Sequence, residues 1–176
     1  QMCIRDSHYR YHPIFIRAKE IYDSGELGRI ERISGAFHIP VTDPNSIRMI
    51  YALGGGVTMD IGCYPSSWVR HITGLEPETV SAVAEEGPQH VDVMLKTEME
   101  FADGVAATTS GDMREGVGFE AWLKVEGQDG SMYVHNPLVP QNGNSIEVTL
   151  GSETRVETFS RRSTYGYQLD AFLAAV

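Results

Sequence analysis

The sequence predicts an α+β domain in which helices cover one face of an open, mostly antiparallel sheet. Three tight connections, at residues 102–104, 128–130 and 151–153, separate runs of strand-favouring residues. The first two contain Asp-Gly, which supplies the positive φ that hairpin turns need. Helical patterns precede and follow these runs instead of alternating with them. Helices are therefore expected on one face of an antiparallel sheet.

The first half of the chain predicts two helices and a strand. Residues 13–24 predict a helix, because proline suits a first turn and the apolar residues recur on one face. Residues 29–39 predict a strand, because their apolar residues share one parity. Residues 57–73 predict a second helix, in which Pro65 is expected to cause a kink or a late start. Its expected buried residues are Ile61, Trp68, Val69 and Ile72.

The second half predicts a multi-stranded meander and a closing helix. The closing helix spans residues 165–176, with Ser163 or Thr164 as its N-cap. The predicted strands are 79–85, 93–101, 105–110, 119–126, 131–135, 145–150 and 154–159.

The uncovered face of such a sheet must be solvated or buried against a partner. Two alternatives are about equal for a set of apolar residues in the meander. They form a face for a homodimer or tetramer, or they belong to the intramolecular core. The set is Trp122, Leu123, Val125 and Met132.

Composition excludes several classes of protein. The 176 residues carry 14 Lys+Arg and 24 Asp+Glu, a net charge of −10. This balance argues against a nucleic-acid binder or a polybasic membrane-surface domain. Two cysteines, Cys3 and Cys63, are too few for a disulfide framework, so a reducing, cytoplasmic compartment is expected. The chain begins at Gln1 and stops inside an apolar helical pattern, so it is expected to be a fragment.

The region richest in residues that could act in catalysis follows the glycines at 54–56. Asp60 and Tyr64 are spaced i, i+4, so in a helix they share a face. Tyrosine can donate or accept a proton, but its pKa of about 10 requires a neighbouring cation near neutral pH. The alternative, favoured on the residues alone, is a buried tyrosine whose hydroxyl bonds Asp60 and stabilises the fold.

A second cluster is Tyr-Arg-Tyr-His-Pro at residues 9–13. Arg10 could bind a phosphate or carboxylate, and His12 could act as an acid or base, although such residues more often cap or pack a helix start. The six histidines lack metal-ligand spacing, so no metal is expected. Cys63 is expected to be a small packed residue and not a nucleophile. The sequence contains no dinucleotide or nucleotide fingerprint.

The order of these motifs resembles the Gfo/Idh/MocA family of NAD(P)-dependent sugar oxidoreductases, over nearly the whole chain from His8. The matching segments are residues 9–13, 24–28 (Ser-Gly-Glu-Leu-Gly), 54–56, 60–64 (Asp-Ile-Gly-Cys-Tyr), 73–74, 76–77 and 165–172. The resemblance implies that residues 8–176 form the C-terminal α+β substrate-binding and oligomerisation domain, incomplete at its C-terminus. The Rossmann domain and the family's catalytic lysine lie outside this chain. Residues 1–7 depart from the family's apolar strand, so Cys3 and Arg5 carry no weight.

The resemblance also implies roles for individual residues. Asp60 and Tyr64 match a family motif, and tyrosine at its last position is similar to the dihydrodiol dehydrogenase, xylose dehydrogenase and glucose–fructose oxidoreductase branch. Tyr64 would move the hydroxyl proton during hydride transfer with NAD or NADP, and Asp60 would bind substrate hydroxyls. Arg10 would lie near the cofactor–substrate junction. Tyr165, at the start of the closing helix, is a candidate to contact a sugar or polyol substrate, although packing is the more common role of aromatic residues at a helix start. The alternative function is a non-catalytic sheet domain for dimerisation or ligand binding.

Overall fold

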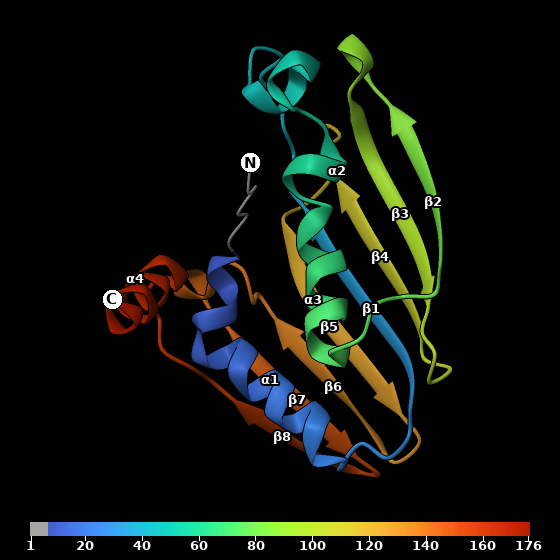
Figure 1. Cartoon of the computed structure of the whole chain (residues 1–176), viewed down its shortest axis with the longest axis vertical. Helices are drawn as coiled ribbons and strands as arrows, with labels where there is room; N and C mark the ends of the chain where they lie inside the picture. Colours follow the sequence, from blue (N-terminus) through green and yellow to red (C-terminus); the bar gives the residue numbers. More distant parts are fainter. Residues whose placement is uncertain (1–6) are drawn as a thin grey trace.

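The computed structural model describes residues 7–176. They form two layers, a sheet and a set of helices on one of its faces (Figure 1). This arrangement confirms the predicted α+β class. The α-helices are α1 (Pro13–Ser24), α2 (Val57–Asp60), α3 (Cys63–Thr73) and α4 (Thr164–Ala175). Short 3-10 helices are η1 (His8–Tyr11), η2 (Ile47–Met49), η3 (Tyr51–Leu53), η4 (Pro88–His90) and η5 (Pro140–Asn142).

The sheet has eight strands in the order β2-β3-β4-β1-β5-β6-β7-β8. All neighbours pair antiparallel except β1 and β4, which are parallel. The strands are β1 (Ile30–His38), β2 (Thr79–Glu86), β3 (Asp92–Glu100), β4 (Ala106–Asp112), β5 (Glu120–Gly127), β6 (Gly130–His135), β7 (Ser145–Leu150) and β8 (Glu153–Glu157). The meander was predicted strand by strand, but the insertion of β1 into its centre was not.

The predicted helix over 57–73 is two helices with a break at Ile61 and Gly62. Gly62 lies directly against Gly111 of β4, where a Cβ on Gly111 would be 3.2 Å from the Gly62 Cα. The two glycines therefore let the helix junction approach the sheet backbone. Pro65 lies in the first turn of α3, where its missing N–H needs no partner, so the late helix start is confirmed.

The core lies between the helices and the sheet. The four residues predicted to be buried in the second helical segment are buried, which confirms that expectation. Leu123, Val125 and Met132 are also fully buried within this core, so the expectation that they form a partner face is wrong for these three. Side chains alternate along a strand, so Trp122 lies on the opposite, open face, stacked on Tyr133 with ring centroids 5.9 Å apart.

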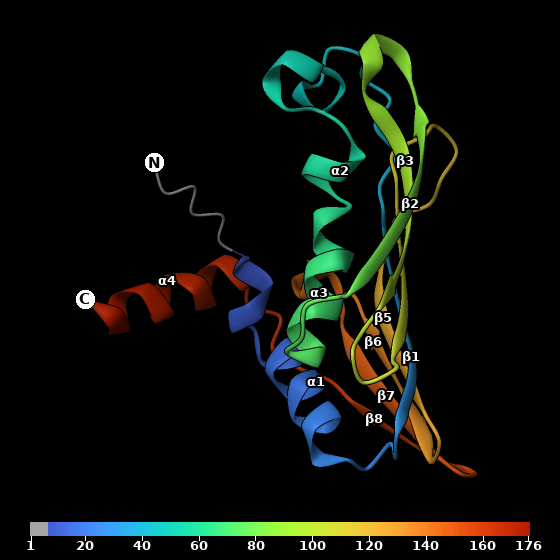
Figure 2. The same cartoon turned by 45° about the vertical axis from the view of Figure 1, so that its right-hand side comes forward.

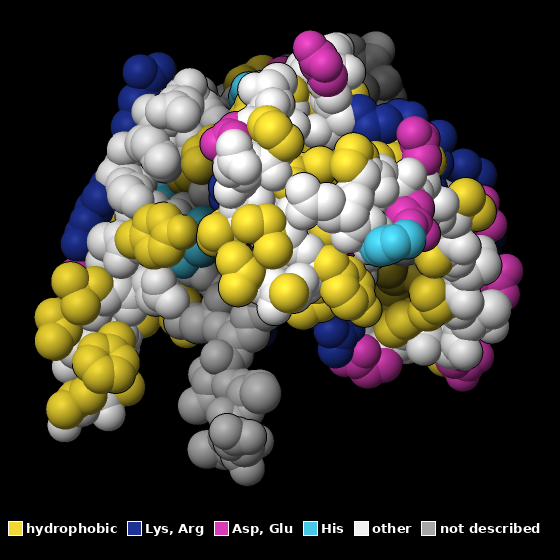
Figure 3. Space-filling view, turned by 90° about the horizontal axis from the view of Figure 1, so that it is seen from above, with side chains coloured by type: hydrophobic (Ala, Val, Ile, Leu, Met, Phe, Trp, Pro, Cys, Tyr) yellow, Lys and Arg dark blue, Asp and Glu magenta, His cyan; other side chains and the backbone are white. Residues whose placement is uncertain are grey.

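The α4 helix projects away from both layers and packs against η1, next to the point where the described chain begins (Figure 2). Ser163 caps it, as predicted. Hydrophobic side chains gather along its projecting part (Figure 3), where Leu169, Phe172 and Leu173 are exposed. An exposed apolar helix face of this kind commonly contacts another protein surface. None of the helices in residues 7–176 combines the length and the apolar character needed to cross a bilayer.

Candidate active site

The glycine-rich corner before α2 fixes where Asp60 lies. Asp92, on β3, accepts hydrogen bonds from the backbone N and the Oγ1 of Thr58 at 2.7 and 2.6 Å, and so caps the start of α2. Gly56 has a φ of 118°, and a Cβ there would lie 2.1 Å from Asp92 Oδ1. Only glycine satisfies both requirements at this position. The corner therefore anchors α2 to β3 and presents its last residue, Asp60, beside the helix junction.

Asp60 and Tyr64 line one cavity of about 160 Å³, and Tyr165 lines the same cavity. Asp60 ends α2 and Tyr64 lies in the first turn of α3, so the helix break carries one residue on each side. Three of the four predicted site residues are therefore brought together. The other lining residues are His8, Phe37, Ile39, Arg48, Ile61, Leu138, Val139, Gln141 and Thr164.

Asp60 forms an ion pair that the sequence analysis missed. Arg48 Nε donates to Asp60 Oδ2 at 2.5 Å. The Asp60 side chain is 31% exposed and that of Arg48 45% exposed. Asp60 is thus a partly exposed carboxylate held by a cation at the edge of the cavity. Arg48 is the middle residue of the short helix η2, 12 positions before Asp60, and no helix or strand spacing in the sequence links the two.

Tyr64 is half-buried and held by the edges of other rings. Its ring centroid lies 5.8 Å from Phe37, 5.9 Å from His8 and 6.4 Å from Tyr9, each in an edge-to-face arrangement. Such contacts restrict the ring without requiring its hydroxyl to be buried. The phenol is therefore positioned by packing at the cavity wall.

His8 is a second residue that the sequence analysis did not select. It is buried, only 7% exposed, and its Nδ1 lies 2.7 Å from Thr164 Oγ1. Its ring stacks on Tyr165 with a centroid separation of 4.3 Å. These contacts join η1 to the start of α4, residues 156 positions apart. They bring Tyr165, from the far end of the chain, to the wall that contains Tyr64.

Tyr9 shows what a structural tyrosine looks like in the same region. It is fully buried, and its hydroxyl lies 2.7 Å from Ser67 Oγ. Burial raises the pKa of Tyr9 to about 12, against a smaller opposing effect of the Ser67 hydrogen bond. A phenol of this kind holds its proton at any physiological pH and serves packing. Tyr64, by contrast, lines the cavity.

His12 caps α1, which is the structural alternative considered for it. Its Nδ1 accepts a hydrogen bond from the backbone N of Ile14 at 3.2 Å, and its Nε2 lies 3.1 Å from the Ser160 carbonyl oxygen. Burial lowers the pKa of His12. The ring is therefore neutral near pH 7 and is occupied at both nitrogens.

Cys63 is half-buried, and its Sγ donates to the carbonyl of Asp60 at 3.4 Å.

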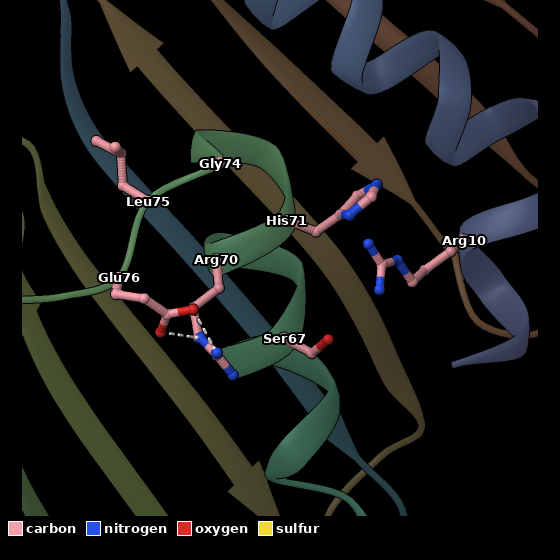
Figure 4. A pocket seen from close by; sticks show the side chains of 7 residues that line it. All are labelled: Arg10, Ser67, Arg70, His71, Gly74, Leu75 and Glu76. Carbon is pink, nitrogen blue, oxygen red and sulfur yellow. Dashed lines mark hydrogen bonds and ion pairs between the residues drawn. The ribbon is translucent and has the colours of Figure 1, made fainter. Parts of the chain in front are cut away.

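Arg10 lies outside the Asp60–Tyr64 cavity. It lines a second cavity of about 270 Å³ together with Ser67, Arg70, His71 and Glu76 (Figure 4). The Arg10 and His71 side chains extend toward one another across it. Glu76 pairs with Arg70 through two hydrogen bonds of 2.7 and 2.5 Å. The structure therefore separates Arg10 from the residues with which it was expected to act, and its cofactor contact stays a prediction.

We expect His71 to make the stability of the protein depend on pH. Burial, helped by the positive charges of Arg10 and Lys19, lowers the pKa of His71 from 6.5 to about 4. Between these values the unfolded chain binds a proton that the folded chain does not, so stability falls as pH drops from 6.5 toward 4. Urea unfolding at pH 7 and pH 5 should show a smaller loss in His71→Gln than in the wild type. His90→Gln, at an exposed site, is the control, and equal losses in all three proteins would contradict the assignment.

The described residues do not form a metal site. In residues 7–176, no three His, Cys, Asp or Glu side chains gather in a way that could hold a metal ion. The described strand-to-helix connections also contain no G-x-G-x-x-G turn.

Comparison with known proteins defines the family. A family model of the GFO/IDH/MocA C-terminal domain matches residues 15–133. D-xylose 1-dehydrogenase (NADP(+)) 2 of Haloferax volcanii is 28% identical over an alignment of 173 positions, which covers 96% of this chain and 52% of that protein. Inositol 2-dehydrogenase of Rhizobium meliloti is 27% identical over 184 residues, covering 95% and 52% respectively. The chain spans about half the length of these relatives.

A solved structure shows the same fold. A 3-ketoreductase from Actinomadura kijaniata, crystallised with NADP and TDP-benzene, superposes with a TM-score of 0.87 at 22% identity. The match covers 96% of this chain and 52% of the ketoreductase. Together with the family match, this fold places residues 7–176 in the second half of such proteins. The chain belongs to the GFO/IDH/MocA family and forms its C-terminal domain.

Proposed function

We propose that the protein containing this chain is an NAD(P)-dependent oxidoreductase that acts on a carbinol carbon of a sugar or cyclic diol. The observation that carries the proposal is the single cavity lined by Asp60 and Tyr64 in a domain of this family. The names of the relatives support the substrate class, because they act on xylose and inositol. The structural alternative for Asp60 and Tyr64 required both to be buried against the sheet, whereas both are only partly buried.

In the proposed reaction each residue has a separate task. During oxidation the Tyr64 oxygen, as a phenolate, takes the proton of the substrate hydroxyl, and during reduction the Tyr64 hydroxyl returns it. Asp60 accepts hydrogen bonds from substrate hydroxyls and so orients the ring. Tyr165 and Phe37 supply aromatic surface against which the C–H face of a sugar packs. When bound, the nicotinamide accepts or supplies the hydride. Because a phenol needs a nearby cation to work near neutral pH, the lysine implied by the family resemblance would complete the site.

The test is a turnover assay on the full-length protein. Nicotinamide absorbance is followed with NAD and with NADP against aldoses, inositols and cyclic diols. Turnover that depends on one of these substrates is the expected result. A folded protein that binds cofactor but oxidises none of them would overturn the proposed substrate class. A folded protein that binds neither NAD nor NADP would favour the non-catalytic sheet domain instead.

We also propose that the open sheet face mediates homo-oligomerisation. The support is the stacked pair of Trp122 and Tyr133, which lie on the face that no helix covers. A partly exposed aromatic pair of this kind is typical of an interface centre. In sedimentation experiments we expect Trp122→Glu to dissociate the full-length protein into monomers. Ile16→Glu, on the outer surface of α1, should leave its mass unchanged, and an oligomer that survives Trp122→Glu would contradict this proposal.

A further inference from the structure

We propose that Arg48 is a substrate-binding residue that works together with Asp60. In this arrangement Asp60 accepts a hydrogen bond from one substrate hydroxyl, and Arg48 donates one to the oxygen of a neighbouring hydroxyl. The proposal rests on the proposed function and deepens it, because it assigns recognition of adjacent hydroxyl groups to a defined pair. Four features carry it: how Arg48 is placed, its unused donors, the charge of the cavity and an unpaired amide.

The backbone of Arg48 is held in place by the glycine corner. Its carbonyl oxygen accepts a hydrogen bond from Gly56 N at 2.8 Å, and its own N donates to Ser46 Oγ at 3.4 Å. A Cβ on Gly55 would lie 2.6 Å from the Arg48 carbonyl oxygen. The glycine at 55 is therefore required so that the loop can fold against the start of α2. The same corner thus positions both Arg48 and Asp60.

The Arg48 side chain has donors to spare. A guanidinium carries five N–H donors, and the bond to Asp60 uses the one on Nε. Among the contacts between described residues, its two terminal nitrogens have no hydrogen-bond partner. The side chain lines the cavity and is 45% exposed. Asp60 therefore orients the guanidinium and leaves its outer edge available to a ligand.

The charge of the cavity favours an uncharged ligand. Asp60 supplies a carboxylate and Arg48 a guanidinium to its lining, and their opposite charges cancel at the pair. The remaining wall includes the apolar residues Phe37 and Leu138. A ligand with a polar edge and a C–H face matches this wall better than a sugar acid or a sugar phosphate does.

Gln141 supplies a further unsatisfied polar group. It lines the cavity, and its Oε1 is buried with no hydrogen-bond partner in the described part of the chain. A buried amide oxygen without a partner is rare and costly unless something else satisfies it. A ligand hydroxyl would do so. With Asp60 and Arg48, the cavity then offers acceptors and donors to several hydroxyl groups of one neutral polyol.

The experiment compares the substrate with its monodeoxy analogues, using full-length wild type and Arg48→Met. We expect loss of one hydroxyl to lower kcat/KM of the wild type by about tenfold to a hundredfold, as for a hydrogen bond to a charged group. In Arg48→Met the same analogue should be penalised no more than about twofold, because the donor is already gone. With the natural substrate, Arg48→Met should raise KM and change kcat little. Arg29→Met is the matched control and should keep the wild-type pattern. Arg29 directly precedes β1, whereas the cavity lies at the other end of that strand, beside Phe37.

The outcomes separate this inference from the proposed function. An analogue penalty that is equal in wild type and Arg48→Met would overturn substrate contact and leave Arg48 as a counter-ion of Asp60. A wild type that neither binds nor oxidises any polyol would overturn the proposed function and this inference with it. If Arg48→Met does not fold, the analogue penalty in kcat/KM is measured in Arg48→Lys instead. One ammonium cannot pair with Asp60 and donate in the guanidinium geometry, so the analogue penalty should still shrink. An undiminished penalty in Arg48→Lys would contradict the inference.

Discussion

Replacing Tyr64 by phenylalanine is expected to lower kcat of the full-length protein in the proposed reaction by about 10²–10⁴-fold, the range for loss of a general acid or base. The ring keeps its edge contacts with Phe37, His8 and Tyr9, because these involve the aromatic carbons and not the hydroxyl. Folding should therefore change little. Initial rates with the best substrate of the panel, together with thermal unfolding, measure both effects.

Tyr133→Phe is the matched control for Tyr64→Phe. Tyr133 is a partly buried tyrosine on the open sheet face, stacked on Trp122 and far from the cavity. Its loss of a hydroxyl should leave kcat at the wild-type level. If Tyr64→Phe also kept wild-type turnover, Tyr64 would have no part in the proton transfer, and the cavity would lose its proposed catalytic group.

Replacing Gly111 by valine should separate the helix junction from the sheet. A Cβ at Gly111 would lie 2.7 Å from Val57 Cγ1 and 3.2 Å from the backbone Cα of Gly62, and its position does not depend on the rotamer of the new side chain. Overpacking of this size costs about 3 kcal/mol, which for a domain of this length lowers Tm by about 6–12 °C. Asp60 and Tyr64 flank the displaced junction. A displacement of about 1 Å is enough to reduce turnover on the order of 100-fold.

Gly118→Val tests whether the effect is specific to the junction. A Cβ at Gly118 meets no atom within 4 Å, and its φ is not in the left-handed region. This variant should unfold at the wild-type temperature and keep its activity. A Gly111→Val protein that is as stable and as active as Gly118→Val would show that the Gly62–Gly111 contact does not position the site.

Local patterns predicted most of the elements because the rules that govern them are local. The helix over 13–24 matches α1 at both ends, since proline suits its first turn and Gly25 in the left-handed region ends it. The hairpins follow from short turns between strand-favouring runs. The insertion of β1 between β4 and β5 depends on pairs of residues 74 to 97 positions apart, which no local sequence pattern can predict.

The site also contains residues that local spacing predicts and residues that only tertiary contacts bring together. Asp60 and Tyr64 are close in sequence, so their shared location could be predicted from spacing, even though a helix break and not one continuous helix brings them together. His8 lines the cavity and contacts Thr164, at the far end of the chain. Arg48 contacts Asp60 because the loop that contains η2 folds against the glycine corner. Contacts of this kind are tertiary. The same limit explains Arg10, because the one turn of η1 directs neighbouring residues to different cavities.

The most direct test of the central claim is a crystal structure of the full-length protein with its nicotinamide cofactor and a polyol. We predict that the polyol occupies the cavity lined by Asp60 and Tyr64. One carbinol oxygen should lie about 2.6–3.2 Å from the Tyr64 hydroxyl, and a second hydroxyl should contact the Asp60 carboxylate. A polyol bound instead in the cavity of Arg10, Arg70 and His71, with no contact to Tyr64, would contradict the account.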